Sequence, residues 1–254
     1  MSSGGYGSFA YCYDKLMGEA DYAARGKAVD GLIKKHGGKR GILLDLACGT
    51  GNMSEVMAKM GYDVIGTDIS EEMLNIAMEK KAESGLAIQY LRQDMRRLDM
   101  FGTVDVTLCM LDSLNHLCSF EDIEETFKRV SLFSDPEGLF LFDMNTPYKH
   151  REILGNNTFV YDLDEVYCVW QNFFDISSTD CRVDISLDFF IPDEKGTYSR
   201  LSDELSETAY DSEVIVNILE KAGFTTLEIL DGDSFDVPRP DSERLMFAAR
   251  SKKV

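Results

Sequence analysis

The stretch GILLDLACGTGNMSEVM, residues 41–57, decides the fold of this chain. It begins with branched apolar residues that favour a buried β-strand, and this run ends near Asp45. A loop with Gly49 and Gly51 follows, and apolar residues then recur at the spacing of an α-helix. Glycine allows unusual backbone angles and lets a ligand approach the main chain closely. We therefore expect a strand, a ligand-binding turn and a helix, in that order.

The same alternation of strand and helix continues to residue 144. Most of the expected strands are near-continuous apolar runs, which is typical of strands buried on both faces of a parallel sheet. Helical patterns lie between them, and Ser70 and Ser119 each stand where an N-cap residue would precede acidic residues. Alternation of this kind predicts βαβ units with right-handed crossovers. The strands expected here are residues 41–47, 62–67, 87–92, 104–111 and 138–144.

The pattern changes after residue 144. In VDISLDFFI, residues 183–191, apolar and polar side chains alternate almost strictly, which indicates a half-exposed antiparallel strand. Residues 192–196 read as a turn, and segments 165–175 and 197–207 are expected to flank the strand. This part of the chain is therefore predicted to be an antiparallel insertion and not another βαβ unit.

After the insertion the earlier pattern resumes, with a helix that ends at Gly223 and strands at residues 225–231 and 243–251. A helical pattern before residue 41 is expected to pack beside the first strand. The predicted parts are an N-terminal helical segment (1–40), an α/β domain (41–145 and 211–254) and an antiparallel β insertion (146–210).

The composition indicates a globular protein that does not bind polyanions. The formal net charge is -19 over 254 residues, which disfavours nucleic acid and anionic membrane surfaces as partners because both need Lys and Arg contacts. No apolar run reaches the roughly 18 residues needed to span a membrane, and the chain does not start like a secretory signal. The six cysteines are scattered and the three histidines are far apart. We therefore expect free thiols, a cytoplasmic location and no bound metal.

Two kinds of cofactor use a glycine loop after the first strand of such a sheet. A nicotinamide dinucleotide needs the pattern G-x-G-x-x-G/A, and residues 49–54 place Ser54 at the third small position. Asp45 before the loop and Asp112 after the fourth strand instead favour a ligand with an ammonium or a sulfonium, because carboxylates repel a diphosphate. Asp68 ends the second strand, where an acid accepts hydrogen bonds from ribose, so it suits either cofactor.

The loop sequence DLACGTGN, residues 45–52, resembles the first motif of class I S-adenosylmethionine-dependent methyltransferases. Asp68 is similar to their acidic residue at the end of the second strand, and Gln93-Asp94-Met95 is similar to their third-strand motif. The resemblance covers residues 41–144. It implies a Rossmann-like α/β fold, in which a seven-stranded, mostly parallel sheet carries helices on both faces and the last strand is antiparallel. S-adenosyl-L-methionine is the cofactor that it implies.

The resemblance also implies roles for individual residues. Asp45 and the loop backbone would hold the methionine part of the cofactor, and Asp68 would hold the ribose. Asp94 would accept the adenine amino group, and the main chain at Met95 would meet the ring. The residues implied to contact the cofactor are Asp45, Ala47, Cys48, Gly49, Thr50, Gly51, Asn52, Asp68, Ile69, Asp94, Met95 and Leu111.

Two further segments resemble a narrower group, the bacterial small-molecule methyltransferases that carry a β insertion after the fifth strand. By this resemblance Tyr13 and Tyr22 cover the cofactor, and the insertion forms a lid on the acceptor side. Members of the group differ in substrate, so the resemblance names no acceptor. The similar residues are Tyr6, Phe9-Ala10, Tyr13-Asp14, Asp21-Tyr22 and Asp112-Ser113-Leu114-Asn115-His116.

Methyl transfer from a sulfonium is an in-line displacement of a methyl group that is already activated. Orientation of the reactants contributes roughly 7–11 kcal/mol, whereas a general base typically adds roughly 10²–10⁴-fold, so a catalytic pair is not required. His116, just past the fourth strand, is our first candidate for a base. His150 follows the fifth strand and could reach the acceptor site, although we expect it to lie in an exposed loop. The candidate contacts of the acceptor are Asp112, Asn115, Trp170, Tyr198 and Arg200.

The expected activity is transfer of a methyl group from S-adenosylmethionine to a small molecule that the sequence does not identify. A non-catalytic module that binds the same cofactor and a NAD-dependent oxidoreductase are the alternatives, and Asp45 and Gln93-Asp94-Met95 weigh against the second. We also expect Gly51→Val to abolish cofactor binding and leave the fold intact, because the branched side chain would occupy ligand space.

Overall fold

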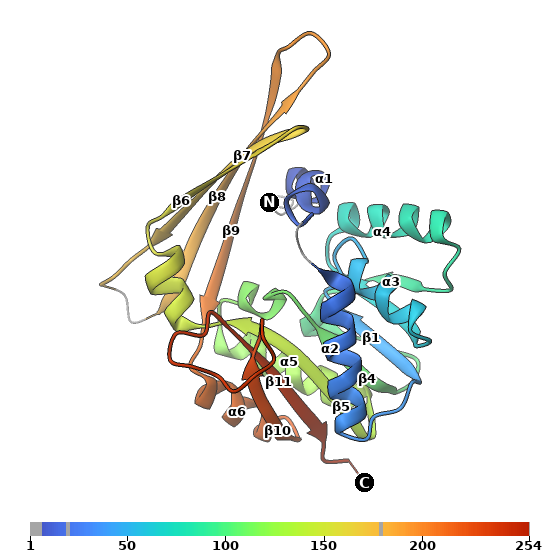
Figure 1. Cartoon of the computed structure of the whole chain (residues 1–254). Coiled ribbons are helices and arrows are strands. Elements are labelled where there is room, and N and C mark those ends of the chain that lie inside the picture. Colours follow the sequence, from blue (N-terminus) through green and yellow to red (C-terminus); the bar gives the residue numbers. More distant parts are fainter. Residues whose placement is uncertain (1–6, 19–20, 178–179, 254) are drawn as a thin grey trace.

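The computed structural model describes residues 7–18, 21–177 and 180–253, so Tyr6 lies outside the described residues. The described chain forms a seven-stranded sheet in the order β10-β11-β5-β4-β1-β2-β3 and a separate four-stranded sheet (Figure 1). No helix in these ranges is long and apolar enough to cross a bilayer. The strands of the larger sheet are β1 (Ile42–Leu46), β2 (Asp63–Asp68), β3 (Gln89–Arg92), β4 (Val104–Cys109), β5 (Ser134–Asn145), β10 (Phe224–Asp231) and β11 (Arg244–Ser251).

The larger sheet is mostly parallel. Parallel pairs join β1 to β2 and β4, β2 to β3, and β4 to β5. β11 lies antiparallel between β5 and β10. Every strand predicted for this sheet is present, although β5 begins at Ser134 and not at residue 138. The predicted α/β fold, with a mostly parallel sheet and an antiparallel last strand, is confirmed.

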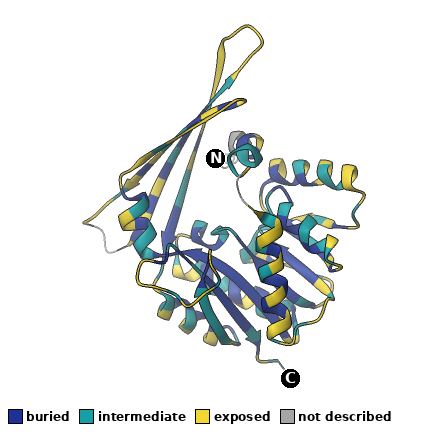
Figure 2. Cartoon of the chain, viewed as in Figure 1, coloured by how far each residue is buried: buried dark blue, intermediate teal, exposed yellow. Residues whose placement is uncertain are grey.

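Helices cover both faces of this sheet, and their outward sides are exposed while the strands between them are buried (Figure 2). Successive residues of β5 point to opposite faces. Leu139 and Leu141 pack with α2 and α3, whereas Phe140 and Phe142 pack with α5 and α6. The helices are α2 (Tyr22–Lys35), α3 (Asn52–Lys59), α4 (Glu71–Ser84), α5 (Phe120–Phe133) and α6 (Ser212–Lys221). The predicted N-caps of α4 and α5, Ser70 and Ser119, both accept a backbone hydrogen bond.

The insertion is an antiparallel sheet in the order β6-β7-β8-β9, and it stands beside the main body (Figure 1). Three of its strands were predicted, whereas β6 and the π-helical turn η3 were not. Only Phe159 of β6 is even partly buried, so this strand carries no strict alternation that its sequence could show. The elements are η3 (Lys149–Leu154), β6 (Thr158–Leu163), β7 (Val166–Phe174), β8 (Cys181–Pro192) and β9 (Tyr198–Ala209).

A short N-terminal helix, α1 (Gly7–Leu16), lies between the insertion and the main body (Figure 1). It contacts α4 on one side and β8 and β9 on the other. Cys12 is buried in the apolar cluster that also contains Val166, Cys168 and Leu187 of the insertion. α1 therefore encloses the carboxyl ends of β1 and β2 together with the second sheet.

Candidate functional site

The loop between β1 and α3 has an unusual backbone. Ala47, Gly49 and Gly51 have φ values of 58°, 54° and 79°. This left-handed region is costly for residues with a Cβ, and an alanine held there is a strain of the kind found at binding sites. A Cβ at Gly49 would meet no atom within 4 Å. The main chain at Gly49 therefore faces open space.

Gly51 has a different role from the predicted one. A Cβ at Gly51 would collide with Oη of Tyr90 and would lie 3.1 Å from Cβ of Ala77. A larger residue would therefore enter the packing between β3 and α4 and not the space of a ligand. The expectation that Gly51→Val leaves the fold intact does not fit this geometry.

Two adjoining cavities, of about 270 and 40 Å³, lie where β1, β2 and β4 end. Every residue predicted to contact the cofactor, Gly51 excepted, lines one of them. The first and second cavities share Tyr13, Ala47, Gly49, Leu111 and Ser113. The first cavity also has Asp68, Ile69, Asp94, Met95 and His116 in its walls, and the second has Tyr22, Asp45, Cys48, Thr50 and Asn52.

Asp45 is the buried carboxylate of the second cavity. Its residue is 2% exposed, and it accepts a hydrogen bond from Oγ of Ser54 at 2.5 Å. Burial raises the pKa of Asp45 to about 7; the Ser54 hydroxyl opposes this rise and the charge of Asp68 adds to it. A cation in the second cavity would stabilise the ionised form of Asp45. The site therefore suits an ammonium or a sulfonium.

Asp68 holds the loop and faces the first cavity. Its Oδ2 accepts the N–H of Gly49 and its Oδ1 accepts the N–H of Ser70, both at 2.8 Å. Burial raises the pKa of Asp68, against these backbone hydrogen bonds. Each carboxylate oxygen retains a lone pair, so Asp68 can accept hydrogen bonds from the hydroxyls of a ligand.

Asp94 carries a partner that the sequence did not reveal. Arg96, in the 3₁₀ turn η1 (Met95–Arg97), donates from Nε and Nη2 to the two oxygens of Asp94, the shortest distance being 2.6 Å. The hydrogen bonds and charge of this guanidinium lower the pKa of Asp94. Both residues line the first cavity. An adenine amino group at Asp94 would therefore share the carboxylate with Arg96.

Tyr22 presents a buried hydroxyl to the second cavity. Its Oη lies near Tyr13 and Asn52, yet no hydrogen bond of standard geometry satisfies it among the described residues. Buried polar groups nearly always have a partner. The orphaned hydroxyl is therefore a place where a polar ligand atom would be stabilised.

Asp14 joins α1 to this loop, a role that sequence reasoning missed. Its Oδ1 accepts hydrogen bonds from Oγ1 of Thr50 at 2.7 Å and Nδ2 of Asn52 at 2.9 Å. Its Oδ2 pairs with Nζ of Lys80 on α4 at 2.5 Å. These partners are far from Asp14 in sequence, so the sequence could not show the contacts. The only sign of a function was that Asp14 lies between Tyr13 and Tyr22, in the segment that resembles the narrower methyltransferase group.

His116 lies where the sequence placed it, beside the first cavity. It ends the 3₁₀ turn η2 (Ser113–His116), and its Nδ1 lies 3.3 Å from the carbonyl oxygen of Ser206 on β9. The ring is half-buried. Its role as a base stays a prediction.

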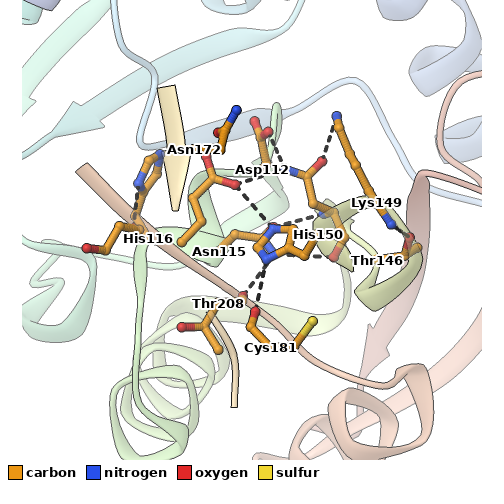
Figure 3. Close-up of polar contacts among 12 residues, drawn as sticks. Asp112, Asn115, His116, Thr146, Lys149, His150, Asn172, Cys181 and Thr208 are labelled. Atoms are coloured by element: carbon orange, nitrogen blue, oxygen red, sulfur yellow. Dashed lines mark hydrogen bonds and ion pairs between the residues drawn. The ribbon is translucent and has the colours of Figure 1, made fainter. Parts of the chain in front are cut away.

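A third cavity, of about 190 Å³, lies between the end of β5 and the insertion. Two of the predicted acceptor contacts, Asp112 and Trp170, line it. Figure 3 shows Asp112 and Lys149 above His150 at this junction. The remaining lining residues, which the sequence did not single out, are Asn145, Lys149, Ile153, Leu154, Phe159, Tyr161 and Glu207.

Asp112 is held as an anion at the edge of this cavity. It accepts hydrogen bonds from Nδ2 of Asn145 at 2.7 Å and Nη2 of Arg244 at 3.2 Å. Although burial opposes it, the charge of Arg244 holds the pKa of Asp112 below its usual range. Asp112 follows Leu111, which lines the first two cavities, so the turn after β4 borders all three cavities.

Tyr198 and Arg200, two more of the predicted acceptor contacts, do not line this cavity, and their role stays a prediction. Both lie at the start of β9, near the far end of the insertion, where Tyr198 is 63% exposed. Arg200 pairs there with Asp188 at 2.8 Å. Their strand was predicted correctly, but sequence does not tell which end of a hairpin meets the rest of the molecule.

Two further predicted positions differ from expectation. Asn115 is fully buried, and its amide bonds the backbone of Asn145 and Thr208, so it fixes the end of β5 and does not face a ligand. His150 was expected in an exposed loop, but its side chain is 0% exposed. It lies in η3, which the insertion covers.

Residues 43–138 match the family described as "Methyltransferase domain". The chain is 35% identical to a putative methyltransferase of Geobacillus sp. (strain WCH70), over 96% of this chain and 99% of that protein. It is 34% identical to the putative methyltransferase YqeM of Bacillus subtilis (strain 168), over 98% of each. The crystal structure of an S-adenosylmethionine-dependent methyltransferase from Clostridium acetobutylicum ATCC 824 is 32% identical, covers 97% of this chain and 98% of that one, and gives a TM-score of 0.87.

These similarities extend over nearly the whole chain, and they agree with the motif at residues 45–52 and with the sheet order. The chain belongs to the S-adenosylmethionine-dependent methyltransferases.

Proposed function

We propose that this chain transfers a methyl group from S-adenosylmethionine to a small molecule bound beside the insertion. The observation that carries the proposal is the pair of adjoining cavities at the strand ends, with the half-buried Asp68 in the first and the buried Asp45 in the second. Asp45 favours a cation and Asp68 favours hydroxyl groups, and the cofactor offers both. A dinucleotide would place a diphosphate near Asp45, where repulsion disfavours it.

The residues present fit this cofactor. The ionised form of Asp45 gains from a nearby cation, and the main chain at Gly49 faces open space. In the described part of the chain, Oη of Tyr22 has no hydrogen bond of standard geometry. We assign the methionine end to Asp45 and Tyr22 and the ribose to Asp68. The adenine then lies against Asp94 and Met95.

When bound, the cofactor supplies a methyl group that its positive sulfur already activates. The chain's own task is to orient the acceptor and exclude water. Leu111 and Ser113 line the first and second cavities, and Asp112 between them lines the third. The turn after β4 therefore borders both the proposed cofactor site and the proposed acceptor site.

We further propose that the parts of the chain have separate tasks. Residues 41–145 and 211–254 bind the cofactor, and the N-terminal segment 1–40 covers it. The insertion, residues 146–210, is the lid on the acceptor side. The contacts of Asp14 with the loop and of Trp170 with the third cavity support these assignments.

A cytoplasmic location is also proposed. All six cysteines are free thiols, and four of them are buried. Free buried cysteines are usual in proteins of a reducing compartment.

Calorimetry with S-adenosylhomocysteine tests the cofactor assignment, and we expect one molecule bound per chain. Transfer of label from methyl-tritiated S-adenosylmethionine to a metabolite extract tests turnover. A titration with NADH serves as the control for the dinucleotide alternative. Binding of NADH without binding of S-adenosylhomocysteine would overturn the proposal.

A further inference from the structure

The third cavity ends on a buried pair, of which Glu207 was not predicted. Glu207 of β9 lines the cavity, and His150 of η3 lies against Glu207. We infer that this pair takes a proton from a small amine that binds in the third cavity and is methylated on nitrogen. The inference rests on the proposed function, since it names the acceptor class of that same site.

The tautomer of His150 follows from its contacts. Nδ1 lies 2.9 Å from the carbonyl oxygen of Cys181, and a carbonyl oxygen only accepts, so Nδ1 carries the ring proton (Figure 3). Nε2 of the neutral ring is then an acceptor. It lies 3.4 Å from Oε2 of Glu207 and has no hydrogen bond among the described residues. Two proton acceptors thus face one another, and a proton placed between them would be held by both.

The carboxylate of Glu207 is fixed in place. Asn145 donates from Nδ2 to Oε2 of Glu207 at 3.0 Å and to Oδ2 of Asp112 at 2.7 Å. Its own Oδ1 accepts from Nζ of Lys149 at 3.2 Å, which defines the orientation of the amide. Two carboxylates on the cavity wall are therefore held together by one side chain.

The rest of the cavity suits an amine with a flat apolar group. Its other walls come from Trp170, Tyr161 and Phe159 and from two aliphatic residues of η3. Trp170 donates from Nε1 to Oδ1 of Asn172 at 2.8 Å, which fixes the indole ring. Arg244 pairs with Asp112 and Lys149 lines the same wall, so Glu207 is the carboxylate that is left to attract an ammonium. The aromatic faces attract it too. The apolar walls would then bury the remainder of the molecule.

An ammonium must lose a proton before its nitrogen can attack. An alkylammonium has an ordinary pKa of about 10.4 and no lone pair for attack at neutral pH. The N–H proton passes to the carboxylate of Glu207 and on to Nε2 of His150, which gives an imidazolium–carboxylate ion pair. An aliphatic alcohol is a much weaker acid, and it offers no positive charge to Glu207.

The step balances as follows in atoms and charge. The freed nitrogen lone pair forms the N–C bond to the methyl carbon while the C–S bond breaks, and sulfur keeps its electron pair. The products are a methylated ammonium and a neutral thioether. The proton held by the pair returns to solvent when the product leaves. Glu207 touches the acceptor and is a catalytic residue, whereas His150 acts through it and is a positioning residue.

Trp170 is the only tryptophan of the chain, so its fluorescence reports on the third cavity. Benzylamine and benzyl alcohol are titrated into protein saturated with S-adenosylhomocysteine. We expect benzylamine to bind about tenfold more tightly than benzyl alcohol, because the ammonium forms a charge-assisted hydrogen bond. In Glu207→Gln the ratio of the two affinities should fall to about one. Glu204→Gln, an exposed position on the same strand, should retain the preference for benzylamine.

A merely structural effect of Glu207→Gln would weaken both probes alike and leave their ratio unchanged. Absence of any preference for benzylamine in the wild-type protein would overturn the inference. Binding of S-adenosylhomocysteine is measured in every variant. Its absence from the wild-type protein would contradict the proposed function instead.

A second measurement needs only the wild-type protein to fold. In ¹⁵N-histidine NMR the ring of His150, assigned with His150→Gln, should start with its proton on Nδ1. Benzylamine added to the complex with S-adenosylhomocysteine should convert it to the imidazolium. A ring that stays neutral while benzylamine binds would refute the proton transfer.

Discussion

The cofactor side and the acceptor side of this molecule are built in different ways. The first and second cavities take much of their wall from one loop, residues 47–52, and from single residues at strand ends. The third cavity takes its wall from side chains of β5, η3, β6, β7 and β9. The loop backbone therefore contributes to the proposed cofactor site, whereas side chains from several elements form the proposed acceptor site. Substitutions should be able to change the acceptor without changing the cofactor.

The largest effect expected on the cofactor side is on folding. Gly51→Ala should lower the free energy of unfolding by about 2–4 kcal/mol, because a Cβ there adds left-handed strain and collides with Tyr90. Gly49→Ala is the matched variant, since its φ is also positive but the space is open. It should cost only about 1–2 kcal/mol. Urea denaturation measures both, and equal losses would show that Tyr90 is not the cause.

The next effect concerns binding. Asp68→Asn should weaken the binding of S-adenosylhomocysteine by about 1–3 kcal/mol, because the charge-assisted hydrogen bonds to ribose are lost. Asp63→Asn, at the exposed start of the same strand, should leave the affinity unchanged. Calorimetry gives both values. Unchanged affinity in Asp68→Asn would remove Asp68 from the cofactor site.

The difference between the two sides also explains what sequence could predict. The loop at residues 45–52 and the acids at strand ends are contiguous motifs, so their place in the fold followed from the strand pattern. Glu207 and His150 meet only because η3 packs against the insertion sheet, and nothing local in the sequence marks that contact. Gly51 was predicted to contact the ligand. The sequence shows that a glycine is needed at this position, but it does not show which neighbouring residue requires it.

The fold was more predictable than the site for a related reason. Strands buried on both faces need continuous apolar runs, and β8 needs alternation, so these patterns are written in single segments. Tyr198 and Trp170 both lie on predicted strands of the insertion. The direction in which the hairpin extends decides that Tyr198 is exposed at its far end and that Trp170 lines the third cavity. The sequence does not show this direction.

A third effect should appear as pH dependence on the cofactor side. Burial raises the pKa of Asp45 to about 7, so Asp45 is protonated below this pH and ionised above it. A cationic ligand prefers the ionised form, so affinity should rise as pH increases. We expect S-adenosylmethionine to bind roughly tenfold more tightly at pH 8 than at pH 6.

Asp45→Asn should remove this rise in affinity, and the variant should bind S-adenosylmethionine weakly at both pH 6 and pH 8. Asp63→Asn is the control, because it keeps both Asp45 and Asp68 and should keep the slope. Calorimetry in buffers of different ionisation enthalpy should also show release of a proton on binding near pH 6. A flat affinity profile in the wild-type protein would contradict the role of Asp45.

A smaller effect concerns the helix that joins the two sides. Asp14→Ala removes the contacts of α1 with Thr50, Asn52 and Lys80. Partly exposed ion pairs contribute about 1 kcal/mol or less, so S-adenosylhomocysteine should dissociate about threefold faster. Glu124→Ala breaks an exposed pair with Lys128 on α5 and should not change the rate. Stopped-flow displacement measures both, and equal rates would mean that α1 does not retain the cofactor.

The smallest effect is expected at the far end of the insertion. Tyr198→Ala should change neither cofactor affinity nor benzylamine affinity by more than about twofold, because Tyr198 is largely exposed and exposed substitutions are usually close to neutral. Trp170→Ala, which removes a wall of the third cavity, should weaken the binding of benzylamine by about tenfold or more. It should leave the binding of S-adenosylhomocysteine unaffected. Calorimetry with both probes compares the two aromatic residues. If Tyr198→Ala weakened benzylamine as strongly as Trp170→Ala, the acceptor would bind along the whole hairpin, and the third cavity would not be its site.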